Sequence, residues 1–130
     1  MVTVAELVRL LELAARRLAR EAAAARRAGA PVEGLRGQAD AFLLLAQELG
    51  EHGDPATLLE AMYDMERAAA WTARLDEERA AELGAQGQAS ASKYHARSAR
   101  YSLGLIEGYQ TARRLLAGAP AGGESSEEAQ

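Results

Sequence analysis

Apolar residues recur every three or four positions through most of this chain, the spacing that indicates amphipathic helices. Thr3 and Glu6 form a capping box, in which the hydroxyl and the carboxylate each satisfy a free backbone N–H, so a first helix begins here. Gly29, Ala30 and Pro31 end that helix. Its predicted buried stripe consists of Val4, Leu7, Leu11, Ala14, Leu18, Ala22 and Ala25.

A second helix is predicted to begin between Pro31 and Leu35 and to end at Leu49. Gly50 follows at the position where a left-handed residue commonly terminates a helix. The buried stripe consists of Leu35, Ala39, Phe42, Ala46 and Leu49. The apolar run 42–45 also places leucines on other faces, so we expect this helix to have neighbours on more than one side.

The third helix has the clearest start signal, with Asp54 as N-cap and Pro55 at the first helical position. We expect it to run to about Leu83. Its predicted stripe consists of Leu58, Met62, Met65, Ala69 and Thr72, followed by Ala68 and Leu75, with Trp71 at the margin. Gly84 and Gly87 then predict a turn. The alternative is one unbroken helix of about 90 Å through this region.

The fourth predicted helix extends from about Ser90 to Ala117. Its apolar and aromatic stripe consists of Tyr94, Ser98, Tyr101, Leu105, Tyr109, Ala112 and Leu116. Small residues at Gly104, Gly108 and Ala112 are spaced four apart, which places them on one face and lets another helix approach closely. The stripe predicts a buried tyrosine face.

Beyond Gly118 the sequence APAGGESSEEAQ has no apolar periodicity, so residues 119–130 are predicted to be a disordered acidic tail. Residues 1–118 are long enough for one hydrophobic core, and no repeat of 20 to 50 residues is present. The pattern predicts an all-α protein: a single domain built as an up-down helical bundle or a helical-hairpin assembly of about four helices.

The composition supports helices, because alanine and leucine dominate while phenylalanine, tryptophan and isoleucine each occur once. Cysteine is absent, which excludes disulfides, thiolate metal sites and a cysteine nucleophile. The N-terminus has neither a secretory signal nor a membrane-spanning stretch, so we expect a soluble cytoplasmic protein. The lack of asparagine and the single lysine beside fourteen arginines indicate a GC-rich genome, as in many bacteria and their phages, although thermophiles share this shortage.

Charge is distributed unevenly along the chain. Residues 1–37 carry seven arginines against four glutamates, and residues 38–83 carry three arginines against eleven acids. Residues 84–118 then carry five basic residues against one glutamate. Because individual surface ion pairs contribute roughly 0 to 1 kcal/mol, we interpret this alternation as a means of choosing helix neighbours.

Motifs for catalysis are missing. Helical carboxylate-bridged metal sites need Glu-x-x-His pairs, but Leu49 and Ser92 stand three positions before His52 and His95. We therefore interpret His52 as part of a solvated turn and His95 as a surface residue. The acids of residues 60–82 resemble those of all-helical nucleotide pyrophosphatases only in being helical and acidic, since one helix supplies most of them. Neither a phosphate-binding glycine loop nor a Gly-x-Ser-x-Gly motif is present. We expect no enzyme activity, no cofactor and no metal ligand.

Apolar residues that lie outside the predicted buried stripes are the main indication of function. If the tyrosine stripe is buried, Leu103 and Ile106 point roughly the other way, and Leu13 and Leu44 similarly fall off the stripes of their helices. Several such residues on different helices indicate either helices that lie centrally within the monomer or, as we favour, a surface shared between subunits. We expect a non-catalytic interaction or assembly module whose partner is a second copy of the chain or another helical protein.

Nucleic-acid binding is the alternative function. The first helix carries a basic band of arginines: Arg16, Arg17, Arg20, Arg26 and Arg27. In the fourth helix Lys93, Arg97 and Arg100 flank Tyr94 and Tyr101, a combination that suits phosphate contacts beside stacking aromatic rings. The formal net charge of −4 argues against this alternative.

Overall fold

The computed structural model describes residues 2–118, so the predicted tail lies outside the described residues. Four helices follow one another: α1 (Val4–Arg27), α2 (Glu33–His52), α3 (Pro55–Ala85) and α4 (Ala89–Ala117). The described part of the chain contains no strand, which confirms the all-α class and the four predicted helices.

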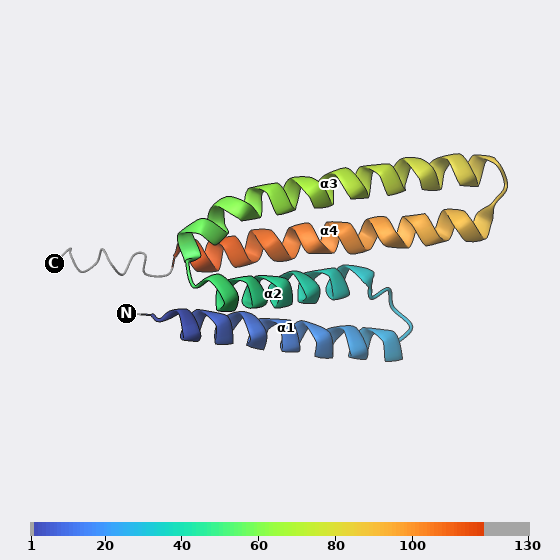
Figure 1. Ribbon diagram of the computed structural model, residues 1–130. Coiled ribbons are helices and arrows are strands. Elements are labelled where there is room, and N and C mark those ends of the chain that lie inside the picture. Colours follow the sequence, from blue (N-terminus) through green and yellow to red (C-terminus); the bar gives the residue numbers. More distant parts are fainter. Residues whose placement is uncertain (1, 119–130) are drawn as a thin grey trace.

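The helices pack side by side in the order α1, α2, α4, α3 (Figure 1). Each is antiparallel to the next along the chain, and α3 and α4 form a hairpin longer than the pair α1 and α2. Gly87, with φ of 77°, makes the turn between α3 and α4, so a single unbroken helix is excluded. The prediction that α2 has neighbours on two sides is confirmed, whereas α1 and α3 at the edges of the array each have one main neighbour.

Helix ends follow the local signals at most positions. Thr3 and Glu6 make the reciprocal bonds of a capping box, and the Asp54 side chain accepts a hydrogen bond from the backbone N–H of Ala56. The predicted end of α2 at Leu49 is wrong, because Gly50 remains in the helix and Gly53, with φ of 70°, is the left-handed cap. The later glycine permits most of another turn of backbone hydrogen bonds before Asp54 starts the next helix.

The core lies between the four helices near the chain ends, and its largest fully buried side chains are Leu11, Leu45, Leu49 and Met62. The predicted stripes of α1 and α2 are buried or half-buried throughout. In α3 the prediction holds for Leu58, Met62, Met65 and Ala69, but Ala68, Thr72 and Leu75 are exposed. An edge helix with one neighbour buries only a narrow stripe, which continues through Ala73 instead.

The tyrosine stripe of α4 is only partly buried. Tyr109 is 4% exposed and belongs to the core, Tyr101 is half-buried, and Tyr94 is 62% exposed. The first turns of α4, which include Tyr94, form the part of the hairpin that extends beyond α2 (Figure 1). The predicted burial of Tyr94 is therefore wrong, since no third helix covers that part of the hairpin.

Backbone contact between α2 and α4 explains the small residues of α4. A Cβ added to Gly104 would lie 2.2 Å from the carbonyl oxygen of Gly34, and one added to Gly108 would lie 2.6 Å from the Ala41 Cβ. Conversely, a Cβ on Gly37 would lie 2.2 Å from the carbonyl oxygen of Tyr101. The predicted close approach of a second helix is confirmed, and that helix is α2.

Candidate interaction surfaces

Large apolar and aromatic side chains are exposed on every helix of the array. Within the described residues they are Val2, Leu10, Leu13, Leu43, Leu44, Tyr63, Trp71, Leu75, Tyr94, Leu103 and Leu115. Single exposed residues of this kind are ordinary on a monomer, so their positions relative to one another decide whether they form a surface.

Trp71 and Leu75 lie on the outer side of α3. Ala69 and Ala73, which are 7% and 3% exposed, bracket Trp71 two positions away on either side. Two residues along a helix correspond to about 200° around its axis, so Trp71 points away from α4. Trp71 is 59% exposed and Leu75 is 48% exposed. The predicted position of Trp71 at the margin of the buried stripe is therefore wrong, because the buried stripe runs through Ala69 and Ala73 on the opposite side of the helix.

The outer side of α1, like that of α3, has an exposed apolar residue that lies between two buried ones. Leu13 is 43% exposed and lies two positions from both Leu11 and Ala15, which are buried. Arg9, between Leu7 and Leu11, faces the same way.

Within the described residues no arginine of α1 forms an ion pair, whereas Arg97, Arg100 and Arg113 of α4 pair with acids of α2 and α3. Of these inter-helix pairs only Arg113–Glu66 joins oppositely charged segments, as the charge alternation predicts, since Glu33, the partner of Arg97 and Arg100, belongs to the basic segment 1–37.

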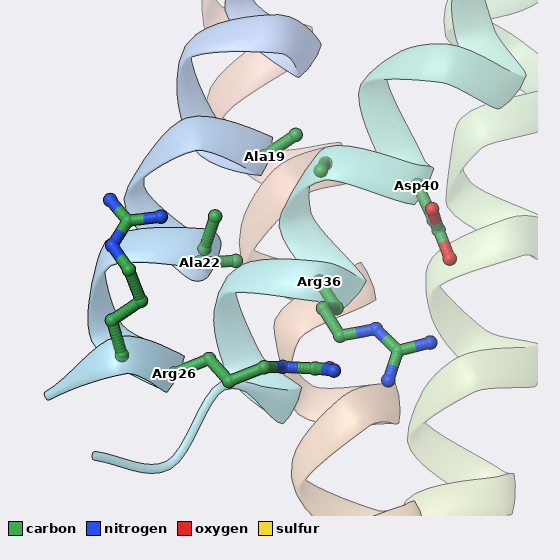
Figure 2. A pocket seen from close by; sticks show the side chains of 8 residues that line it. Ala19, Ala22, Arg26, Arg36 and Asp40 are labelled. Carbon is green, nitrogen blue, oxygen red and sulfur yellow. The ribbon is translucent and has the colours of Figure 1, made fainter. Parts of the chain in front are cut away.

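A series of open depressions crosses the array. The first, of about 460 Å³, lies between α1 and α2, with Arg26 extending from α1 beside Arg36 and Asp40 of α2 (Figure 2). Asp40 also lines a second depression, together with Leu43. Asp40 and Leu43 both line a third depression, which reaches Tyr101. A fourth, of about 490 Å³, continues from Tyr101 between α3 and α4. The depressions therefore form one furrowed surface, lined by alanines and leucines together with arginines and other polar residues.

Tyr101 and Asp40 occupy the middle of that surface. The Tyr101 hydroxyl donates to Asp40 Oδ2 at 2.5 Å and links α4 to α2. Burial, together with the neighbouring carboxylate, raises the pKa of Tyr101 to about 12. The pair fixes two packed helices and leaves the phenol protonated, which suits a structural link rather than a proton-transfer site.

His95 is not the surface residue that the sequence suggested. It is half-buried, its Nδ1 lies 2.8 Å from Asp76 Oδ1, and Ser98 donates to Asp76 Oδ2 at 2.7 Å. The hydrogen bond from His95, with that from Ser98, holds the pKa of Asp76 below its usual value although burial opposes it. Because the serine bonds the aspartate and not the histidine, the nucleophile–base contact of a catalytic triad is missing. The cluster holds α3 against α4.

A second polar cross-link between α3 and α4 joins Glu66 to Arg113 as a mostly buried ion pair. The guanidinium carbon of Arg113 also lies 4.8 Å from the centre of the Tyr63 ring. The aromatic ring and the carboxylate therefore both stabilise the same charge.

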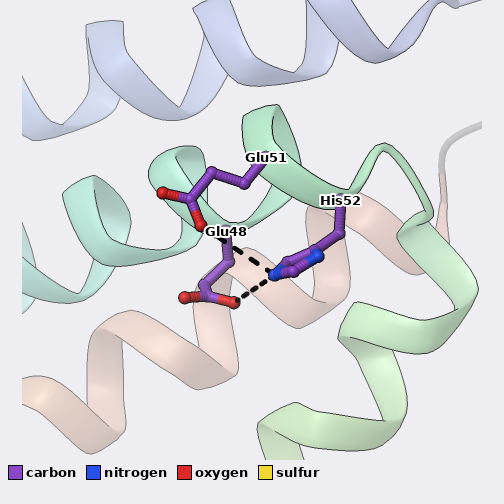
Figure 3. A group of neighbouring side chains, drawn as sticks. All are labelled: Glu48, Glu51 and His52. Carbon is purple, nitrogen blue, oxygen red and sulfur yellow. Dashed lines mark ion pairs between the residues drawn. The ribbon is translucent and has the colours of Figure 1, made fainter.

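Glu48, Glu51 and His52 form the one group within residues 2–118 whose potential metal-ligand atoms lie within 4.8 Å of one another. His52 Nε2 lies 3.5 Å from Glu48 and 3.9 Å from Glu51 (Figure 3). His52 belongs to the last turn of α2 and not to a loop, which corrects the sequence interpretation. All three side chains are exposed, with no buried partner to fix them, so solvated ion pairs explain the arrangement.

The residues predicted for a protein interface do not form one patch. Leu13 lies on the outer side of α1, and Leu44 lines the depression beside Tyr101. Leu103 is exposed on α4, but Ile106 is half-buried and packs against the core. Ile106 therefore points into the monomer, because α3 covers the face of α4 that the sequence assigned to solvent.

The arginines predicted to contact nucleic acid do not lie at one site. Arg26 and Arg27 line the first depression together with Arg36, and Arg16 lines the second. Arg17 and Arg20 are exposed away from these depressions. The predicted band is therefore solvent-accessible, but its members do not converge on one groove.

Comparison with known proteins gives no family: no protein-family model, no curated protein and no solved structure matches this chain. None of the helices in the described residues is long and apolar enough to cross a membrane.

Proposed function

We propose that this protein is a non-catalytic helical assembly module that associates with copies of itself. The observation that carries the proposal is the set of exposed large apolar side chains on all four helices, which includes the only tryptophan of the chain. Tryptophan is among the residues most enriched at the energetic centres of protein interfaces, and leaving it in water on a monomer forgoes its burial energy.

The open array supports the same proposal. In a closed four-helix bundle each helix has two neighbours, whereas α1 and α3 have one main neighbour each. Their outer sides are the natural place for a further helix. Small helical proteins commonly complete such packing by forming symmetric homo-oligomers.

Light scattering coupled to size-exclusion chromatography over a range of concentrations tests the proposal. We expect a mass above the 13.8 kDa of one chain that rises with concentration. A mass of one chain at every concentration would refute self-association. Substitution of Leu13, Leu44 or Leu103 by arginine, each checked for folding by circular dichroism, identifies which exposed surface is used.

Nucleic-acid binding is the second candidate function, and it is favoured by the arginines of α1, which form no ion pair within residues 2–118. It predicts binding to single- or double-stranded DNA or RNA that weakens steeply with salt. Fluorescence anisotropy with labelled oligonucleotides tests this directly. An R16E/R17E/R20E variant should lose the binding, and absence of any anisotropy change at low salt would exclude this candidate.

A further inference from the structure

We propose that the outer side of α3 in one copy docks against the outer side of α1 in a second copy. The contact joins Trp71 and Leu75 of α3 to Leu13 of α1, with acidic side chains around the former and arginines around the latter. This inference deepens the self-association proposed above and rests on it, because it names the two surfaces that meet.

The α3 surface has an apolar centre with acidic flanks. Trp71 and Leu75 are one helical turn apart and therefore adjacent on the helix surface. Glu60 lies two positions from Leu58 and Met62, which are 6% and 0% exposed, so it points outward like Trp71. The remaining charges of α3 are the acids Asp64, Glu66, Asp76, Glu77, Glu78 and Glu82 and the arginines Arg67, Arg74 and Arg79.

Some of these charges are already paired inside the monomer. Arg67 pairs with Asp64 and Arg79 pairs with Glu82, while the Arg74 guanidinium lies 5.8 Å from the centre of the Trp71 ring. Within the described residues Glu60, Glu77 and Glu78 form no ion pair. Within the described residues the outer side of α3 therefore has unpaired acids toward both ends of the helix, Glu60 before the tryptophan and Glu77 and Glu78 after it, while Arg74 lies beside the tryptophan itself.

The α1 surface complements the α3 surface, because it has an apolar centre and carries charge of the opposite sign. Leu13 lies at its centre, and Arg9 and Arg20 are each bracketed two positions away by buried residues, so they project on the same side. Arg16, between them, completes a basic line along the helix. Arginine and tryptophan also attract each other directly when a guanidinium stacks on the indole ring. A docked α3 would thus bury its tryptophan among the methyl groups of leucine and the stems of arginines.

A second copy fits this surface better than a nucleic acid. A polyanion bound to α1 would pair the arginines but would leave Trp71 and Leu75 exposed on the opposite edge of the array (Figure 1). The acidic α3 would repel that polyanion. Docking of α3 on α1 covers both exposed apolar centres and pairs both sets of charges in one contact.

The two surfaces lie on opposite edges of the array, so the contact is heterologous. A copy that uses both edges has two neighbours, and successive copies extend the helical array in a line or close it into a ring. A copy in which one edge is disabled can still offer its other edge to a copy whose matching edge is intact.

The single tryptophan makes the contact measurable in the native chain. As the protein concentration rises through the association range, we expect the emission of Trp71 to shift to shorter wavelength and to become protected from iodide quenching. L13R should abolish both changes, although it lies on another helix. L103R is the matched control, because Leu103 has the same 43% exposure as Leu13 but lies on α4, outside the proposed contact.

The association constant provides a second measurement. W71A should weaken association roughly 30-fold, the effect of losing an interface hot spot. R16E/R20E and E60K/E78K should each block self-association, since they place like charges on both edges. An equimolar mixture of these two variants should associate again, because each then offers an edge of the opposite sign to the other. Circular dichroism verifies that every variant is folded.

The outcomes separate the two proposals. A monomer at every concentration would refute both of them. An oligomer whose Trp71 emission is unchanged by association, or one that L13R preserves and L103R disrupts, would overturn this contact while leaving self-association intact. Nucleic-acid binding that is abolished by R16E/R20E, in a protein whose variants mix without associating, would assign the arginines to a polyanion instead.

Discussion

Replacement of Gly37 by alanine tests the backbone contact on which the array depends. The new Cβ would lie 2.2 Å from the Tyr101 carbonyl oxygen and 2.8 Å from the Leu105 backbone nitrogen. Both neighbours are backbone atoms, so no side-chain rotation relieves the overlap and α2 must move about 1 Å away from α4. A gap of this size loses a quarter to a half of the dispersion energy of each contact pair, and overpacking typically costs about 1 to 3 kcal/mol.

Alanine also favours the helix by about 1 kcal/mol over glycine, which offsets part of this loss. We expect G37A to lower the free energy of unfolding by about 2 kcal/mol. Gly50 is the matched control: it lies in the same helix, and a Cβ there would meet nothing within 4 Å. G50A should therefore stabilise the protein by up to about 1 kcal/mol.

Urea denaturation followed by far-ultraviolet circular dichroism measures both changes, at one fixed protein concentration because association adds to stability. The melting temperatures of the two variants should differ by roughly 10 °C. The reasoning is refuted if G37A is as stable as G50A, because α2 and α4 would then not touch through their backbones.

Three further outcomes are expected. D76N should destabilise the hairpin of α3 and α4. It should also make the free energy of unfolding depend less on pH in acid, because the lowered pKa of Asp76 gives stability that is present above pH 3.8 and lost as the pH falls below it. Y101F should reduce the loss of stability between pH 10 and 12, since the unfolded tyrosine ionises near 10.0 while the folded one, bonded to Asp40, stays protonated to about 12. G53A should cost about 1 kcal/mol or more in thermal unfolding, since alanine is strained at φ of 70°.

The sequence determined the helices themselves. Capping signals at Thr3 and Asp54 and the glycine at the turn before α4 act through nearest neighbours, so they are readable without knowledge of the fold. The buried stripes of α1 and α2 were equally readable. The end of α2 was not, because Gly50 and Gly53 are both suitable terminators and only the continued backbone hydrogen bonding chose between them.

The tertiary structure decided which faces are covered. An apolar residue at helical spacing is buried only where a neighbour exists, and the order α1, α2, α4, α3 leaves the outer sides of α1 and α3 without one. The same order packed Ile106 against the core, brought His95 to Asp76, and left Trp71 in solvent. The spacing of apolar residues along the chain determines where the helices form. The number of helices packed against each one determines which of its faces stay exposed to a partner.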